Sequence, residues 1–235
     1  MNVVSLMAHQ DDEMGCLGTM LKCGGRGDRL YFITLTDGSK GFSHQPDIAP
    51  AEAARIRQEE MSALAGRLEA EYINLRQPDE FLYDTPEVRM ALIEAIRQTR
   101  AELIFTHYHE DYNLDHSTVA SLARHCVMQA CLPVLPTRSA RLEVSPAVFM
   151  TVPHGSFVFP VTHFVDISAY EDEKIALLGL HRSQEQAMRQ SVGAGFERLC
   201  HRTDGYWGQQ AGCDYAEGFV PLRGRGTIKP YAVLP

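Results

Sequence analysis

Short apolar runs alternate with amphipathic stretches over the first 131 residues. The apolar runs predict strands at residues 3–8, 30–36, 71–75 and 103–106. Apolar residues at helical spacing predict a helix at residues 14–23, which Gly24-Gly25 should end, and further helices around residues 61–68 and through residues 119–130. Another helix should begin at Thr85-Pro86, which supply an N-cap and a first-turn proline. This alternation predicts βαβ units and therefore an α/β fold with a mostly parallel, doubly wound sheet.

The regular pattern weakens after residue 131. We expect strands at residues 147–152 and 162–167, a helix near residues 169–189, and then a glycine-rich tail without a clear period. The sequence shows no internal repeat, low-complexity tract or linker. We therefore interpret residues 1–235 as a single domain, with a βαβ core at 1–131 and an additional, less regular portion at 132–235.

Two polar clusters follow predicted strands. His9-Gln10-Asp11-Asp12-Glu13 comes directly after the first strand, and residues 107–116 follow the fourth. Ligand sites in open parallel sheets lie at the carboxyl ends of the strands, where the strand order reverses. In the common order 3-2-1-4-5 the first and fourth strands are neighbours at that point, so we expect His9, Asp12 and His116 to converge. Two imidazoles and a carboxylate form a ligand set for a catalytic metal with open positions for water.

Two carboxylates next to the proposed ligands, Asp11 and Asp115, are candidates for proton transfer and for orienting a ligand. Asp11 is the nearest candidate for a general base, and Asp115 for a carboxylate that accepts a hydrogen bond from an imidazole. Helix capping is the structural alternative for Asp12, and for Asp115 or Ser117, while His107 and His109 are compatible with an exposed loop. Two such clusters at strand ends of one sheet favour the metal site.

Charge and composition narrow the class of protein. The 22 Lys and Arg residues against 30 Asp and Glu give a net charge of -8, which argues against a nucleic-acid partner. We find no signal peptide and no apolar run near the length of a membrane span, so we expect a cytoplasmic protein. The six cysteines form no CxxC pair, and we interpret them as free thiols.

The two clusters also resemble known motifs. Ala8-His9-Gln10-Asp11-Asp12-Glu13 resembles the AHPDDE signature of the LmbE-like, PIG-L type N-deacetylases, and residues 109–116 resemble their second motif, which ends in Asp-His. Further similarity lies in Asp37-Gly38, in Arg57 with Glu60, and in residues 181–184 and 216–219. The resemblance implies a Rossmann-like sheet with helices on both faces and removal of acetyl from an N-acetylated amino sugar, such as an N-acetylglucosamine derivative, or a related amine. It also implies one zinc ion, or another divalent metal, on His9, Asp12 and His116, with Asp11 as general base.

The chain departs from the family pattern at two positions. Gln10 replaces the usual proline, and Asn113 stands where some members have a histidine that stabilises the oxyanion. Candidates for that role are Asn113, whose amide can donate a hydrogen bond, and His109, His154 or His181. The resemblance also suggests substrate contacts at Arg57, Asp79 and His109. A packed histidine at position 181 and a buried ion pair at Arg57 remain structural alternatives.

Other functions use similar residues. The same mechanism on a different amide, such as a sugar conjugate or an antibiotic intermediate, is the first alternative. Non-haem iron oxygenases also use two histidines and one carboxylate, but usually on a β scaffold, which the βαβ pattern argues against. A non-catalytic sugar-binding protein would not need the intact ligand set and base. The sequence leaves the oligomeric state open.

Overall fold

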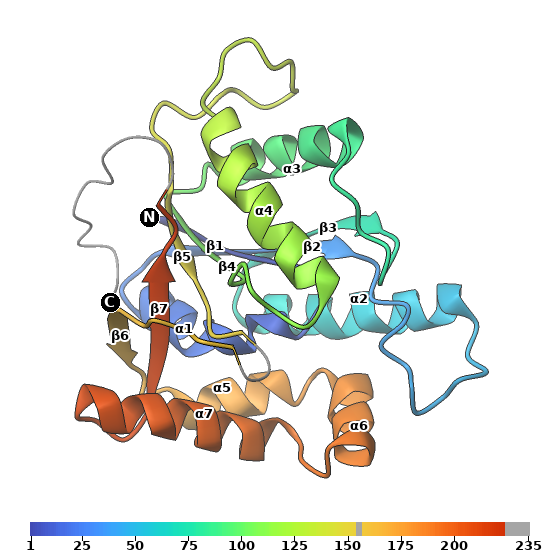
Figure 1. The fold of residues 1–235 in the computed structure, drawn as a ribbon, viewed down its shortest axis with the longest axis vertical. Coiled ribbons are helices and arrows are strands. Elements are labelled where there is room, and N and C mark those ends of the chain that lie inside the picture. Colours follow the sequence, from blue (N-terminus) through green and yellow to red (C-terminus); the bar gives the residue numbers. More distant parts are fainter. Residues whose placement is uncertain (154–156, 224–235) are drawn as a thin grey trace.

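A computed structural model describes residues 1–153 and 157–223 of the chain, which form an α/β fold around a single sheet (Figure 1). The strands are β1 (Asn2–Met7), β2 (Arg29–Thr36), β3 (Glu71–Gln77), β4 (Leu103–Thr106), β5 (Ala147–Met150), β6 (His163–Asp166) and β7 (Ala216–Pro221). The helices are the 3₁₀ turn η1 (Asp12–Gly15), α1 (Leu17–Gly25), α2 (Pro50–Arg67), α3 (Pro86–Thr99), α4 (Leu114–Gln129), α5 (Glu171–Leu178), α6 (Arg182–Ser191) and α7 (Phe196–Ala211).

The order of strands in the sheet is β3-β2-β1-β4-β5-β7-β6. The pairs from β3 to β5 are parallel, and β7 runs antiparallel to both β5 and β6. The predicted doubly wound sheet and its 3-2-1-4-5 order are thus confirmed, with two antiparallel strands added at one edge. Leu6 of β1 lies opposite Thr106 of β4, so the residues that follow these two strands emerge at the same edge.

Successive side chains of the strands enter two separate cores. In β1, Val4 and Leu6 pack into the core beneath α3 and α4, whereas Val3 and Met7 pack into the core beneath α1, α2, α5 and α7. Both faces of the sheet are therefore covered by helices, as Figure 1 shows. Burial on both faces explains why the strands have near-continuous apolar sequences.

The structure differs from the sequence prediction mainly at element ends and in the last third of the chain. The first helix starts as η1 and continues as α1 through Gly24-Gly25, which we expected to end it. The helix predicted at residues 169–189 is two helices, α5 and α6. The segment expected to lack regular structure contains α7 and β7. Gly208 is one reason why the sequence did not predict α7. A Cβ at this position would lie 2.4 Å from the backbone oxygen of Asp214, so the helix needs glycine there. Glycine is unfavourable inside helices, and it therefore weakens the helical signal in the sequence.

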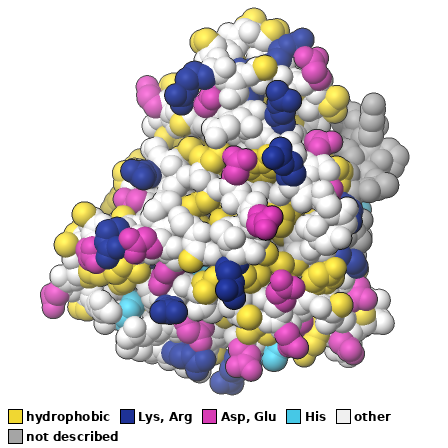
Figure 2. All heavy atoms as spheres, turned by 180° about the vertical axis from the view of Figure 1, so that it is seen from behind, with side chains coloured by type: hydrophobic (Ala, Val, Ile, Leu, Met, Phe, Trp, Pro, Cys, Tyr) yellow, Lys and Arg dark blue, Asp and Glu magenta, His cyan; other side chains and the backbone are white. Residues whose placement is uncertain are grey.

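Charges of both signs are intermixed over the face shown in Figure 2, without separation into acidic and basic regions. Among residues 1–153 and 157–223, every helix is too short or too polar to cross a membrane.

Candidate active site

The turn after β1 directs two adjacent carboxylates to different partners. Asp11 has φ 114°, a left-handed conformation that is rare for a residue with a side chain, and its N–H donates to Glu13 Oε2 at 3.0 Å. The Asp11 carboxylate contacts Arg57 of α2, whereas Asp12 accepts the His9 N–H at 2.7 Å and faces the histidines. The left-handed conformation of Asp11 thus lets two adjacent aspartates point to different partners, Asp11 to Arg57 and Asp12 to the histidines.

Three potential ligand atoms converge at the edge of β1 and β4. Nδ1 of His9 lies 3.1 Å from Oδ2 of Asp12 and 3.2 Å from Nε2 of His116. Nε2 of His116 lies 3.4 Å from Oδ1 of Asp12. The structure therefore brings together the three residues that the sequence suggested as metal ligands, and they form a group able to hold an ion.

The far nitrogen of each imidazole meets a carboxylate. Nε2 of His9 lies 3.0 Å from Oδ1 of Asp79, and Nδ1 of His116 lies 3.1 Å from Oδ2 of Asp111. An N–H on each far nitrogen leaves the lone pair of the near nitrogen directed at the common point. The donor set thus has the orientation, as well as the residue types, that a divalent metal requires.

The electrostatics of this group favour a cation. Burial alone would lower the pKa of His116, but the Asp12 and Asp111 carboxylates outweigh it and raise the pKa to about 9. Burial would raise the pKa of Asp12, but His116, His9 and His107 hold it well below its usual range. A positive charge is therefore stabilised where the ligand atoms meet.

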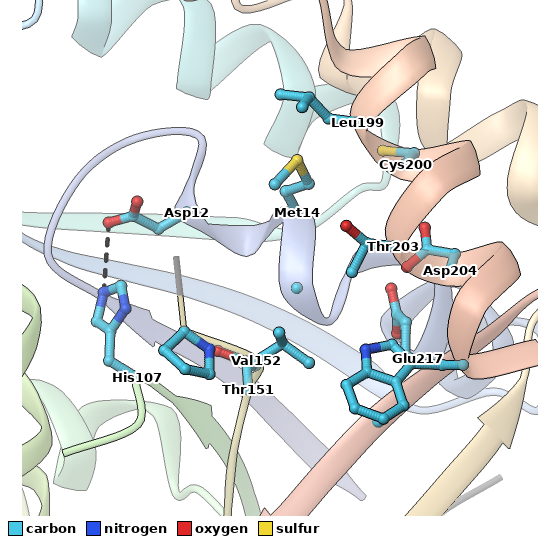
Figure 3. A pocket seen from close by; sticks show the side chains of 14 residues that line it. Asp12, Met14, His107, Thr151, Val152, Leu199, Cys200, Thr203, Asp204 and Glu217 are labelled. Atoms are coloured by element: carbon cyan, nitrogen blue, oxygen red, sulfur yellow. Dashed lines mark ion pairs between the residues drawn. The ribbon is translucent and has the colours of Figure 1, made fainter. Parts of the chain in front are cut away.

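His107 supports the site in the neutral form. Burial and the neighbouring His116 lower the pKa of His107 to about 4. Its Nε2 accepts the N–H of Ala8 at 2.9 Å, and its ring stacks on that of His116 with centroids 4.0 Å apart. Nε2 of His107 also lies 3.3 Å from Oδ2 of Asp12 (Figure 3). This histidine is buried, in contrast to the exposed loop position considered from sequence.

Asp11 is an ionisable group next to the candidate metal ligands. Its Oδ1 lies 2.6 Å from Nη2 of Arg57, which is buried and also donates to the Gln10 carbonyl oxygen. Burial raises the pKa of Asp11 above its usual range, against the opposing effect of Arg57. A carboxylate with a raised pKa is a better proton acceptor than an ordinary surface aspartate.

These side chains open onto a cavity of about 450 Å³, which we call the substrate cavity. Its lining includes His9, Asp11, Asp12, Arg57, Asp79, Asn113 and His116. Asn113 is the N-cap of α4, with its Oδ1 accepting the Asp115 N–H at 2.8 Å. Its carbonyl oxygen is thus engaged in the helix cap, and its amide N–H groups are the part that can serve a ligand.

The remaining predicted residues have varied surroundings. The Asp79 carboxylate is buried, and its Oδ2 accepts the Lys40 N–H at 2.6 Å. Asp115 accepts the N–H groups of Glu80 and Leu82 at 2.8 and 3.1 Å, and its Oδ2 lies 3.4 Å from Nε2 of His9.

Two other candidates, His109 and His181, are not among the described residues that line the substrate cavity. His181 is fully buried, with Nε2 2.6 Å from Oε1 of Glu13. His109 is exposed and packs on Tyr108. His154 lies outside the described residues.

Sequence reasoning gave no role to Asp111, His107 or Glu13. Asp111 belongs to the second motif, and His107 follows β4 as directly as the His9 turn follows β1. Position at a strand end was therefore a usable signal for His107. Glu13 links the backbone of Asp11 to His181, and no local pattern identifies a partner so distant in the chain.

The chain is similar in sequence or in fold to several known proteins. A diacetylchitobiose deacetylase of Thermococcus kodakarensis is 28% identical over 93% of this chain and 83% of its own. A conserved protein of Thermus thermophilus is 28% identical over 97% of both chains, with a TM-score of 0.79. The 4-carboxy-2-hydroxymuconate hydratase of Pseudomonas putida has a TM-score of 0.81 at 21% identity, covering 98% of this chain and all of its own. Because one fold carries different chemistries, function has to be argued from the site.

The match to a family model covers the same site. The model for PIG-L, described as GlcNAc-PI de-N-acetylase, matches residues 4–127, which include both polar clusters. It spans more than half of the chain and agrees with the resemblance identified in the two motifs. The chain therefore belongs to the PIG-L family.

Proposed function

We propose that this protein is a metal-dependent N-deacetylase that removes acetyl from an N-acetylated amino sugar or sugar conjugate, such as an N-acetylglucosamine derivative. The observation that carries the proposal is the convergence of His9, Asp12 and His116, with Asp79 and Asp111 behind the two imidazoles and Asp11 beside them. The family and the deacetylase from Thermococcus kodakarensis support the reaction class and the sugar character of the substrate.

His9, Asp12 and His116 would hold one divalent metal, most simply zinc, because nitrogen and oxygen donors in this number leave open positions. When bound, such a metal acidifies water and polarises an amide carbonyl. The cavity of about 450 Å³ lies within the usual size of small-molecule sites and has polar lining groups suited to sugar hydroxyls.

Asp11 moves the proton in this proposal. It accepts a proton from the water that adds to the amide carbonyl carbon, and it returns that proton to the nitrogen as the C–N bond breaks. The products are acetate and the free amine. Arg57 orients the Asp11 carboxylate, and the amide of Asn113 donates to the carbonyl oxygen as negative charge develops there.

Metal analysis together with acetate release tests the proposal. We expect one divalent metal ion per chain in the purified protein and acetate release from N-acetylglucosamine or N,N′-diacetylchitobiose. His9→Ala, Asp12→Ala and His116→Ala should each lose most of the metal. Full metal content in all three folded variants would exclude this ligand set.

The Asp11→Asn variant separates the two adjacent aspartates. It should keep its metal and lose roughly 10²- to 10⁴-fold in turnover, the usual effect of removing a general base. Metal loss equal to that of Asp12→Ala would show that the roles of Asp11 and Asp12 are exchanged. A metal-loaded wild-type protein that releases no acetate from any N-acetylated sugar tested would refute the proposed reaction.

A further inference from the structure

Asp11 has a backbone conformation that residues with a side chain normally avoid. Its φ of 114° and ψ of -16° lie outside the regions that L-residues favour. Such a conformation costs free energy and persists only where the surrounding contacts hold it. It also sends the Asp11 carboxylate to Arg57 while the next side chain, Asp12, faces the histidines. The contacts that hold Asp11 therefore decide whether the proposed general base stands beside the candidate metal ligands.

The side chain of Glu13 holds the backbone of Asp11. Oε2 of Glu13 accepts the Asp11 N–H at 3.0 Å, and the Asp11 carbonyl oxygen accepts the Met14 N–H at 3.1 Å. The second contact closes the turn of η1. The first contact engages the N–H, and because φ is the rotation about the N–Cα bond, a fixed N–H also fixes the direction of the side chain. Glu13 is therefore the side chain that can maintain the unusual φ of Asp11.

His181 holds Glu13 in turn. Nε2 of His181 lies 2.6 Å from Oε1 of Glu13, and both side chains are buried. An ionised carboxylate only accepts hydrogen bonds, so Nε2 carries the proton and donates it. The two oxygens of Glu13 are thus divided between Asp11 and His181. A buried carboxylate needs such partners, because a buried charge without them is costly.

The turn that contains His181 is itself anchored. His181 is the N-cap of α6, and its carbonyl oxygen accepts two N–H groups of the first turn of that helix at 3.1 and 2.9 Å. Ser183 in the same turn donates its N–H and its hydroxyl to Glu60 of α2 at 2.8 and 2.6 Å, where α2 and α6 lie side by side (Figure 1). A chain of contacts therefore runs from α6 through His181 and Glu13 to Asp11.

We propose that Glu13 and His181 are positioning residues, which hold Asp11 in its left-handed conformation and thereby keep its carboxylate in place as the general base. This inference rests on the proposed function and gives a role to the motif at residues 181–184, which the proposed reaction does not use. Among the described residues, the lining of the substrate cavity includes neither Glu13 nor His181. Both residues therefore act through Asp11 and not on the substrate.

Loss of either residue should lower turnover without loss of metal or of substrate affinity. Glu13→Ala and His181→Ala should each keep one metal ion per chain and nearly the wild-type KM for an N-acetylated sugar. Because a misplacement of about 1 Å can cost roughly 10²-fold in rate, kcat should fall by about that factor. His181→Gln should recover at least about tenfold, since the glutamine amide can replace Nε2 as the donor to Glu13. Glu13→Ala serves if His181→Ala fails to fold.

A double variant separates a positioning role from a direct one. Asp11→Asn already lacks the base, so the addition of His181→Ala should lower kcat by less than about threefold further. If His181 instead donated directly to the oxyanion, its loss would cost a similar factor with and without the base. Full multiplication of the two single losses would therefore overturn the proposal.

Hydrogen exchange tests the contact without any substrate. The Asp11 N–H is hydrogen-bonded to Glu13 in the folded protein, so its exchange, followed by NMR, should be slow in wild type. It should be at least about tenfold faster in Glu13→Ala and in His181→Ala. Wild-type exchange rates in both variants would overturn the proposal even if the protein is a deacetylase.

Leu178→Ala is the matched control for loss of packing. Leu178 is fully buried, three residues before His181, and its side chain makes no hydrogen bond to Glu13. The variant should lower Tm but keep the wild-type kcat and the wild-type exchange rate of the Asp11 N–H. An equal fall in kcat in Leu178→Ala and His181→Ala would overturn the positioning role. Absence of acetate release by metal-loaded wild type would instead contradict the proposed function, and the exchange rates would still decide whether Glu13 and His181 hold Asp11.

Discussion

Oδ1 of Asp79 lies 3.0 Å from Nε2 of His9, and this contact fixes which nitrogen of the imidazole faces Asp12 and His116. Asp79 is itself held by the N–H of Lys40, so its carboxylate has little freedom to turn toward the cavity. The resemblance suggested Asp79 as a sugar contact. Its position in the structure supports a different proposal, in which Asp79 orients a metal ligand.

Asp79→Asn should weaken binding of the metal by about 10- to 100-fold, because an amide is a poorer acceptor for the His9 N–H. Competition with a zinc chelator measures this affinity. Asp84→Asn is the control, since it makes the same change at an exposed carboxylate paired with Arg89. If metal affinity is unchanged and the KM for the sugar is raised, Asp79 contacts the substrate, as the resemblance suggested, and does not orient His9.

The convergence of His9, Asp12 and His116 was accessible from sequence because His9 and Asp12 follow β1 and His116 lies in the first turn of α4, the helix that follows β4. The places of β1 and β4 in the sheet follow from the βαβ pattern. The pairing of Asp111 with His116 depends on the path of the loop after β4, which no periodicity describes. The Glu13–His181 contact depends on how α6 is placed against η1. The sequence thus predicts contacts between residues at the ends of neighbouring strands and at the start of the helix that follows, and it misses contacts that depend on the path of a loop or on the packing of a helix distant in the chain.

The C-terminal elements were missed for a related reason. α7 buries Phe196 and Cys200 but also Asp204 and Gly208, so its buried face does not read as an apolar stripe. Asp204 is buried because it pairs with Lys174 from another helix. Such a face becomes recognisable only when the partner charge is known.

The buried Asp204 makes stability depend on pH. Burial raises its pKa from 3.8 to about 8, so the folded protein retains a proton that the unfolded chain releases. The contribution of this group to stability is complete below about pH 4 and is lost as the pH rises through about 8. Asp204→Asn should therefore reduce the fall in the free energy of unfolding across this range, by up to about 1.4 kcal/mol per pH unit.

Urea denaturation at several pH values between these limits checks this expectation. Asp172→Asn, at an exposed position of α5, makes the same chemical change and should reproduce the wild-type slope. If Asp204→Asn and wild type lose stability in parallel over this range, Asp204 is already ionised in the folded protein and the expectation fails.

The cysteines should divide into two reactivity classes. Cys16, Cys23, Cys126 and Cys200 are buried, whereas Cys131 and Cys213 are half-buried. Burial raises the pKa of the Cys23, Cys126 and Cys200 thiols to about 12, which suppresses the reactive thiolate. Titration of the native protein with a thiol reagent near pH 8 should show rapid reaction only of Cys131 and Cys213. Rapid reaction in a variant with serine at both positions would contradict this division.

Asn113 has two functions to separate, because its Oδ1 caps α4 while its amide N–H groups are proposed to stabilise the oxyanion. Asn113→Ala removes both and should also cost about 1 kcal/mol of stability from the lost cap. Asn113→Ser keeps an oxygen for the Asp115 N–H but removes the amide. If the amide acts in catalysis, both variants should lose about 10- to 1000-fold in turnover, since each lacks the oxyanion donor.

The pH profile distinguishes Asn113 from a histidine donor. A neutral amide does not titrate, so both variants should keep the limbs of the wild-type pH profile nearly where they are, whereas loss of a histidinium donor would remove or shift the alkaline limb. His181→Ala is the comparison, because His181 is one of the histidine candidates and is buried against Glu13. Unchanged turnover in Asn113→Ser, beside a His181→Ala enzyme that keeps its metal but loses turnover and the alkaline limb, would assign the oxyanion role to His181.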